Sequence, residues 1–399
     1  MYPASFLRGE EVKEPIKTII QLTILIDSEP NKRYIGLVKY NWQQTDWPEF
    51  KYDSLQVQDV LFTFAEKTGH VSGVLNSLPD STQTEAIIDL MVSEAVKTSE
   101  IEGEYLSRSD VMSSIRHNLG LVADKEHIAD QRARGAADLM VDVRETYREA
   151  LSEKKLFEWH KMLLSSQKRL EVGAWRTHGE PMQVVSGPVG KWKVHFEAPP
   201  SEKVPAEMAR FISWFNKDET KNPILRSAIA HLYFESIHPF EDGNGRIGRA
   251  ISEKALSQGL CRPVLLSLSE SIEANKKAYY DALKTAQRSN EVTAWIVYFS
   301  NTALDAQSRA EESIGFILRK TKYFDHFKEQ LNERQMKVIR RMFDAGPTGF
   351  KGGMSTRKYI AITRTSKATA TRDLQYLSAI GALEQTGGGR STRYEIGLR

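Results

Sequence analysis

The sequence predicts a mainly α-helical protein with one β-hairpin in its body and a small module of helices and strands at its C-terminal end. Apolar residues recur at steps of three and four over most of the chain from residue 82 to residue 320, which is typical of helices that bury one face. Residues 173–200 differ, because they are rich in Gly, Pro and Val. Residues 331–399 show three helical stretches followed by two short strands around a Gly-rich turn.

The length and composition are those of a folded protein with more than one domain. The chain has 399 residues, of which 40% are apolar and 27% charged. A single cysteine, Cys261, excludes an internal disulfide framework and a cysteine-based zinc site. The apolar run at residues 18–26 is too short to span a bilayer, and acidic residues precede it, unlike the basic leader of a signal peptide. We therefore expect a cytoplasmic protein with no membrane segment.

The net charge of +3 is unevenly distributed. Residues 331–399 hold 13 Lys or Arg against 5 Asp or Glu, a net charge of +8, so the preceding residues carry −5. A basic module on an acidic body predicts an acidic partner, with nucleic acid as the first candidate. The alternative is that the basic surface keeps a small domain soluble.

We expect four parts along the chain. Residues 1–80 form an N-terminal arm and a small helical domain, residues 81–304 a helical core, residues 305–332 a helical linker, and residues 333–399 the terminal module. Residues 1–33 contain three prolines and no clear amphipathic period. Trp42, Trp47 and Phe50 are spaced too irregularly for one helix face, and we expect them to fill a small core rather than to stack on a ligand.

The core is expected to be helical apart from one hairpin. Helices are predicted over residues 82–119, 126–149, 156–165, 205–215, 225–237, 246–258, 271–288 and 292–320. Two strand-like runs, 182–187 and 191–196, surround the turn sequence Gly-Pro-Val-Gly at residues 187–190. These residue types predict a β-hairpin at this point.

Residues 238–249, HPFEDGNGRIGR, join two of these helices and carry groups suited to phosphates. Gly243, Asn244 and Gly245 allow positive φ, so that successive backbone N–H groups turn toward one anion. The helix that follows adds the positive end of its dipole. Arg246 and Arg249 lie three residues apart on one face of that helix, with both guanidinium groups near the same anion. The segment therefore predicts a polyphosphate site.

Asp242 and His238 add two more chemical groups to this segment. A carboxylate beside phosphates is unfavourable unless a cation lies between them, so Asp242 is the candidate magnesium ligand. The His238 imidazole can accept the proton of an attacking hydroxyl. A lone histidine at a helix end or a lone GNG turn is usually structural, but their combination with the arginines indicates phosphoryl or nucleotidyl transfer.

This segment resembles the signature of the Fic family, HPF-x-D/E-GNGR-x-x-R, and matches it at every fixed position. The similarity extends over about residues 87–303 and includes the hairpin, which resembles the family's flap over the target segment. The resemblance implies that residues 81–304 are a catalytic core. Such a core transfers AMP from Mg-ATP to a Ser, Thr or Tyr hydroxyl of a protein and, we expect, to itself.

The resemblance also implies roles for individual residues. His238 is the base, Phe240 anchors the loop in the core, and Asp242 holds Mg²⁺. The implied nucleotide contacts are Gly243, Asn244, Gly245, Arg246 and Arg249 along the phosphates, Ile247 and Gly248 between the two arginines, Tyr279 and Gln287 at the adenine end, and Val185, Ser186 and Gly187 in the flap.

A helical segment upstream ends in Thr98-Ser-Glu-Ile-Glu-Gly103. Thr98 and Glu102 lie one turn apart on one face, and Gly103 is a suitable helix stop. A glutamate on a helix is usually a solvated charge, but this segment resembles the Fic inhibitory motif S/T-x-x-x-E-G/N. The resemblance implies that Glu102 pairs with Arg249. The carboxylate would then compete with the γ-phosphate for the same guanidinium group.

The terminal module resembles a winged helix-turn-helix. Its helices are predicted over residues 333–343, 355–362 and 366–380, and its two-stranded wing over residues 383–396. The third helix exposes Lys367 and Arg372. Winged helices bind DNA or other proteins, and both kinds of partner stay open for residues 333–399.

Three other functions compete with protein adenylylation. The same fold could remove AMP from a target, with Glu102 positioning a water, or could transfer another phosphate-linked group. From a different class, the chain could be a DNA-binding regulator that senses nucleotides; such a sensor needs the anion site but not the His238 base. Both arginines favour a triphosphate donor. Dimerisation is an expectation from the resemblance alone.

Overall fold

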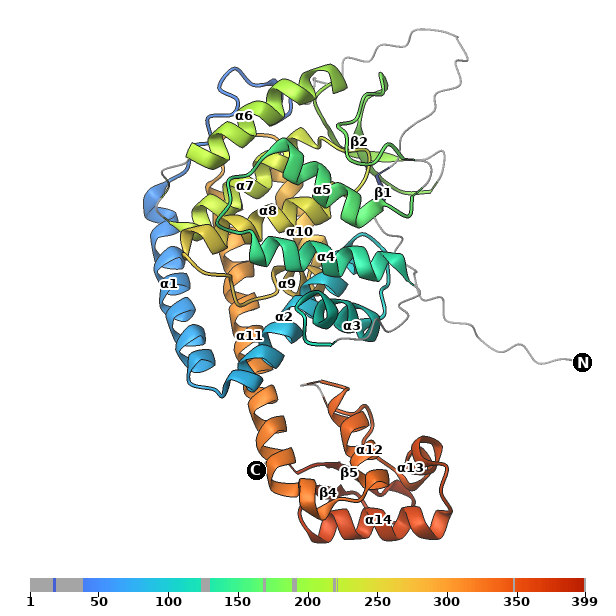
Figure 1. The fold of residues 1–399 in the computed structure, drawn as a ribbon. Coiled ribbons are helices and arrows are strands. Elements are labelled where there is room, and N and C mark those ends of the chain that lie inside the picture. Colours follow the sequence, from blue (N-terminus) through green and yellow to red (C-terminus); the bar gives the residue numbers. More distant parts are fainter. Residues whose placement is uncertain are drawn as a thin grey trace, which may run out of the picture. The chain divides into compact units, whose positions relative to one another are not determined.

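The structure is a computed structural model that describes residues 39–122, 130–167, 170–188, 192–217, 220, 222–346 and 349–397, and the backbone of Lys17–Thr18. The rest of the predicted N-terminal arm lies outside these residues. The chain divides into two compact units (Figure 1). The first holds the described residues up to Thr68 and Met91–Ala306, and the second holds Gly69–Leu90 and Gln307 onward.

The described residues are mainly helical, as predicted. Three helices contribute residues to both units: α1 (Ser54–Asn76), α2 (Asp80–Ile101) and α11 (Thr293–Phe327). The other helices of the first unit are α3 (Arg108–Asn118), α4 (Gln131–Glu145), α5 (Glu153–Leu164), α6 (Val204–Lys217), α7 (Pro223–Ile237), α8 (Asn244–Gly259), α9 (Leu268–Ala274) and α10 (Lys276–Ala286). None of the described helices is long and apolar enough to cross a bilayer.

Helix α7 is the centre of the first unit. It begins at Pro223, after the Asn222 side chain caps it by accepting hydrogen bonds from the N–H groups of Ile224 and Leu225. Nearly all of its residues are buried, as expected for a helix that is apolar on all sides. Its most extensive packing is against α8, and α6 covers it on another side (Figure 1).

Two of the predicted helices are interrupted. The helix expected over residues 82–119 ends at Ile101, because Gly103 adopts φ 82° and turns the chain before α3 begins at its Ser107 cap. The helix expected over residues 271–288 is divided into α9 and α10 at Asn275, whose φ of −137° and ψ of 51° are not helical. Apolar periodicity continues through such turns and does not reveal them.

The predicted hairpin is present. Strand β2 (Gln183–Ser186) pairs antiparallel with β3 (Lys193–Glu197), with Gln183 opposite Glu197 and an irregularity between Val184 and Val185. The short strand β1 (Lys17–Thr18), which the sequence did not predict, pairs with β2 on its other edge.

The N-terminal aromatic residues fill a core, as expected. The Trp47 ring meets Phe50 and Tyr233 edge to face, with ring centroids 5.5 and 5.1 Å apart. The Trp42 indole N–H donates to the carbonyl of Glu197, 2.7 Å away, and so ties this segment to the hairpin.

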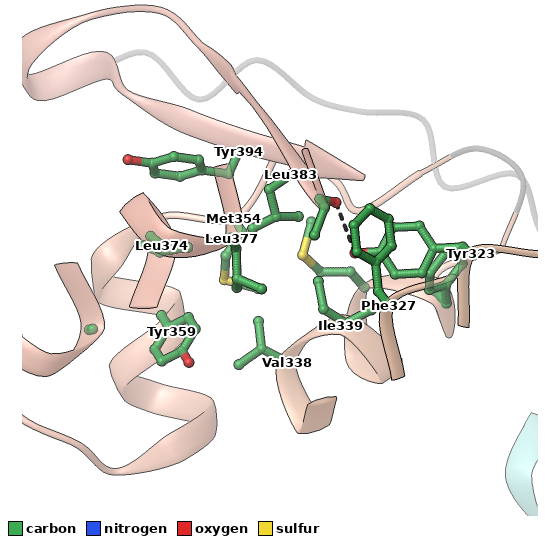
Figure 2. Close-up of a cluster of buried hydrophobic side chains, with 14 of the residues drawn as sticks. Tyr323, Phe327, Val338, Ile339, Met354, Tyr359, Leu374, Leu377, Leu383 and Tyr394 are labelled. Carbon is green, nitrogen blue, oxygen red and sulfur yellow. Dashed lines mark hydrogen bonds between the residues drawn. The ribbon is translucent and has the colours of Figure 1, made fainter. Parts of the chain in front are cut away.

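The second unit ends in helices α12 (Glu333–Phe343), α13 (Thr356–Thr363) and α14 (Lys367–Ala379), followed by the strands β4 (Leu383–Thr386) and β5 (Arg393–Ile396). This order agrees with the predicted order of elements. Figure 2 shows its core, in which Tyr323 and Phe327 of α11 meet residues of all three helices and the strands. The Tyr323 hydroxyl donates to the carbonyl of Ala382, 2.8 Å away. The likeness to a winged helix and its choice of partner remain predictions.

Candidate active site

The loop between α7 and α8 begins with a residue in an uncommon backbone conformation. His238 has φ 50° and ψ 61°, and its N–H donates to the carbonyl of Phe234 at 2.9 Å, which ends α7. Left-handed geometry is rare for a residue with a side chain and is frequent at functional sites. His238 is buried, so its imidazole is held at the end of a rigid helix.

Phe240 anchors the loop in the core, as predicted. Its ring is fully buried and stacks on the His160 ring, with centroids 4.1 Å apart, and lies 5.0 Å from the Trp175 ring. The Asn244 side chain closes the loop, because its Oδ1 accepts from the Phe240 N–H and its Nδ2 donates to the Phe240 carbonyl, at 2.9 and 2.8 Å. The Asn244 side chain therefore braces the loop, and its backbone is the part suited to a phosphate.

Two buried basic side chains that the sequence analysis missed hold this loop from outside. Arg176 donates from Nε to the His238 carbonyl at 2.9 Å, and burial lowers its pKa to about 10. His160 accepts from the Gly173 N–H on Nδ1 at 2.8 Å, so Nε2 carries the proton that it donates to the Asp242 carbonyl at 3.2 Å. Burial lowers the pKa of His160 to about 4, which keeps this tautomer neutral. Neither residue belongs to a local motif, so only the fold reveals them.

Phe240→Ala is expected to lower the free energy of unfolding of the first unit by about 3–5 kcal/mol, because it leaves a cavity among four aromatic rings. Denaturation followed by tryptophan fluorescence measures this, since all 7 tryptophans lie in that unit. Phe62→Ala is the matched control, because Phe62 is 73% exposed and should cost less than about 1 kcal/mol. Equal effects of the two changes would contradict the anchoring role.

The glycines of the loop make room for neighbouring groups. Gly243 has φ 82° and precedes α8, as the anion nest requires. A Cβ on Gly245 would collide with the Glu102 carboxylate, and a Cβ on Gly248 would collide with the Glu235 carboxylate. Two of the three positions are therefore glycine because carboxylates occupy the adjacent space.

The two arginines of α8 are each paired with a carboxylate from the turn after α2. Arg249 donates to the Glu102 carboxylate at 2.7 Å, to the Thr98 hydroxyl at 2.7 Å and to the Thr98 carbonyl at 3.0 Å. Burial opposes its charge, yet Glu102 raises the pKa of Arg249 above its ordinary value. The predicted ion pair of Glu102 with Arg249 is thus present.

Arg246 has a partner that the sequence analysis did not name. Its guanidinium group donates to the Glu104 carboxylate at 2.7 Å and lies 3.7 Å from Asp242. Arg246 is 3% exposed, so its guanidinium group is buried like that of Arg249, with fewer hydrogen bonds. A second acid two residues after Glu102, in the same turn, was the available signal.

A cavity of about 420 Å³ adjoins these residues in the first unit. The predicted residues that line it are His238, Gly245, Arg249, Tyr279, Gln287, Glu102 and Gly103. The hairpin contributes Val184, His195 and Phe196 to the lining, whereas Val185, Ser186 and Gly187 do not line it. Asp242, Gly243, Asn244, Arg246, Ile247, Gly248 and Thr98 also lie outside the lining, and the Ile247 side chain is fully buried.

The two residues predicted for the adenine end, Tyr279 and Gln287, are fixed by buried hydrogen bonds. The Tyr279 hydroxyl lies 2.8 Å from His231 Nε2, and the Gln287 amide donates to the Glu235 carbonyl at 3.1 Å. Tyr279 lies on α10 and Gln287 is the residue that ends it, and both side chains face α7. The cavity therefore joins a histidine, a buried arginine and an aromatic wall, a combination suited to a nucleotide.

This helix–loop–helix geometry is the one that the Fic signature implies. Comparison with known proteins finds similarity to the same family. Residues 150–256 match the Fic/DOC family, and residues 40–121 match a domain of unknown function (DUF4172). The similarity to the Fic/DOC family therefore covers the loop between α7 and α8 and the helices that precede it from α5 onward. A crystal structure of a Fic family protein from Desulfovibrio desulfuricans G20 aligns with a TM-score of 0.52 and 19% identity, covering 88% of this chain and 98% of that one. At this identity the likeness shows a shared fold.

Curated relatives are similar over shorter stretches. The chain is 29% identical over 115 residues to the probable protein adenylyltransferase aq_aa38 of Aquifex aeolicus (strain VF5), covering 27% of this chain. It is 32% identical over 133 residues to the protein adenylyltransferase fic-1 of Caenorhabditis briggsae, covering 33% of this chain. The matches span 36% and 23% of the lengths of these two relatives.

Proposed function

We propose that this chain is a protein adenylyltransferase, which transfers AMP from Mg-ATP to a Ser, Thr or Tyr hydroxyl of a target protein. The observation that carries the proposal is that His238, Arg249, Tyr279 and Gln287 line one cavity beside the start of α8. The names of the relatives support adenylylation as the chemistry.

The reaction follows from the positions of these groups. The target hydroxyl oxygen attacks the α-phosphorus as His238 accepts its proton. A new O–P bond forms, the bond to the bridging oxygen breaks, and pyrophosphate leaves. The backbone N–H groups of Asn244 and Gly245 and the positive end of α8 stabilise the charge on the phosphate oxygens. Arg246 and Arg249 bind the distal phosphates once these two arginines have been released from Glu104 and Glu102.

Asp242 is suited to hold Mg²⁺. Its side chain is 43% exposed at the mouth of the loop, and its Oδ1 accepts from the Gly243 N–H at 2.6 Å, which fixes the carboxylate. Over the described ranges, no three acidic, His or Cys side chains form a metal cluster. One carboxylate fits Mg²⁺ bound to a nucleotide, because water and phosphates supply most of its ligands. When bound, the ion neutralises phosphate charge.

Asp242→Asn is expected to reduce AMP transfer at least a hundredfold, because the neutral amide binds Mg²⁺ weakly. Transfer from labelled ATP is measured against Mg²⁺ concentration, and excess Mg²⁺ should restore part of the activity. Glu241→Gln is the control, since it removes the adjacent carboxylate of the loop. A magnesium dependence unchanged in Asp242→Asn would contradict the assignment.

We also propose that Glu102 inhibits the enzyme from within the chain. Its carboxylate holds Arg249 and lies against Gly245, in the space adjoining the start of α8. A γ-phosphate near Arg249 would therefore meet both competition and charge repulsion. A nucleotide that binds while Glu102 stays in place would have its phosphates displaced from the position needed for attack.

Incubation of the Glu102→Gly variant with Mg²⁺ and labelled ATP, UTP or GTP in cell lysate, followed by mass spectrometry, tests the proposed function. AMP on a hydroxyl side chain of a target protein supports it. Labelling by UTP or GTP alone would show that the transferred group is UMP or GMP and not AMP. Release of AMP from adenylylated proteins by the unmutated chain, lost in Glu102→Gly, would instead favour hydrolytic removal of AMP, in which Glu102 positions a water. DNA contact by residues 333–399, dimerisation and a cytoplasmic location remain predictions.

A further inference from the structure

Glu235 is a buried carboxylate that the proposed mechanism does not use. It lies on the last turn of α7, three residues before His238, and is 4% exposed. Its Oε2 is 3.6 Å from His238 Nδ1. Within the described part of the chain, Glu235 Oε1 and both ring nitrogens of His238 are buried without a hydrogen-bond partner. A buried polar group in this state is costly unless the site has a use for it.

The surroundings preserve a place for this carboxylate. A Cβ at Gly248 would collide with Glu235 Oε1, so the glycine of α8 leaves space that the carboxylate occupies. The Gln287 amide donates to the Glu235 backbone carbonyl at 3.1 Å, which ties this turn of α7 to the end of α10. The carboxylate also lines the same cavity as His238.

The other histidine beside Glu235 is already satisfied. The Ser252 hydroxyl donates to the Gly248 carbonyl at 2.9 Å, so its oxygen accepts from His231 Nδ1–H at 3.0 Å. His231 Nε2 then accepts from the Tyr279 hydroxyl at 2.8 Å. Burial lowers the pKa of His231, which agrees with a neutral ring. His238 is therefore the histidine whose ring N–H is available to donate to Glu235.

We propose that Glu235 is the positioning residue of the catalytic base. It accepts a hydrogen bond from His238 Nδ1–H, which fixes the tautomer with a lone pair on Nε2 and stabilises the imidazolium formed when His238 takes the hydroxyl proton. The inference rests on the proposed function. A carboxylate that orients a histidine base has this role in hydrolytic triads, and such contacts are often long before substrate binds.

The charge of Glu235 is consistent with this role. Burial alone raises its pKa, but the contact with His238 and the positive charge of Arg249 together hold the pKa of Glu235 below its ordinary value. Glu235 is thus an anion at neutral pH. The titratable and charged groups that face it are His231 and His238 of α7, Arg249 of α8, and Tyr279 and Tyr280 of α10.

The kinetic test compares Glu235→Gln and Glu235→Asp in the Glu102→Gly background. In Glu235→Gln we expect kcat to fall at least thirtyfold with the KM for ATP changed less than threefold. The acidic limb of the pH–rate profile should move to lower pH, because the imidazolium loses its counter-charge. Glu235→Asp should recover part of kcat. A kcat within threefold of the parent, or a loss of kcat with the acidic limb unmoved, overturns the proposal.

A measurement on the unmutated protein does not depend on activity or on the folding of a variant. Nitrogen NMR of histidine-labelled full-length chain should show His238 with its proton on Nδ1, assigned by loss of the signal in His238→Ala. A proton on Nε2 overturns the role of Glu235. If His238→Ala still transfers AMP, the proposed function fails instead, so the two failures are distinguishable.

Discussion

Removing the Glu102 carboxylate should raise the initial rate of AMP transfer at least tenfold, which corresponds to about 1.4 kcal/mol of activation free energy. The reason is the 2.7 Å ion pair that holds Arg249 while Arg249 is 2% exposed. In Glu102→Gly the guanidinium group becomes available to the γ-phosphate. Glu104 still pairs with Arg246 in this variant, so the tenfold figure is a lower bound.

The experiment measures transfer of labelled AMP in initial-rate conditions. Glu100→Gly is the matched control, because it makes the same change at the end of the same helix but breaks an ion pair with Lys97, 2.7 Å long, instead of the pair with Arg249. We expect the control to change the rate less than threefold. Equal rates for Glu102→Gly and the unmutated chain would refute inhibition by Glu102.

Loss of the base gives the second large effect. Glu102→Gly/His238→Ala should transfer AMP at least a hundredfold more slowly than Glu102→Gly, the range expected for removal of a general base. ATP affinity should change less than threefold, because the phosphate contacts come from the loop backbone and the α8 arginines. Rates and ATP binding are measured on the same preparations.

His70→Ala is the control for this variant, because it removes an exposed imidazole of the second unit. It should leave transfer unchanged. Persistence of transfer in the His238 variant would show that His238 is not the base. The anion site alone would then fit a protein that senses nucleotides.

The parts of the site that the sequence could predict are those that are local in the chain. Residues 238–249 are contiguous, so a phosphate site with a histidine base could be predicted from the residue types of His238, Gly243 and the arginines and from their spacing. The contact of Glu102 with Arg249 joins residues 147 positions apart, and it was predictable only because the motif around Glu102 resembles a known inhibitory segment.

What the sequence could not predict depends on tertiary packing. Arg176 reaches the His238 carbonyl and Glu104 reaches Arg246 across 62 and 142 positions, and neither residue belongs to a local motif. Glu235 is one of several polar residues in a mostly apolar helix. Its carboxylate comes next to Gly248 only after α7 packs on α8. The interruption at Asn275 was missed because apolar spacing does not register a single non-helical residue.

The claim on which the account depends is that the loop after α7 binds the phosphates of ATP. A crystal structure of Glu102→Gly with Mg²⁺ and a non-hydrolysable ATP analogue tests it directly. We expect the phosphates within hydrogen-bond distance of the N–H groups of Asn244 and Gly245 and of both α8 arginines, with the adenine beside Tyr279 and Gln287. A nucleotide bound elsewhere, out of contact with residues 238–249, would contradict the account.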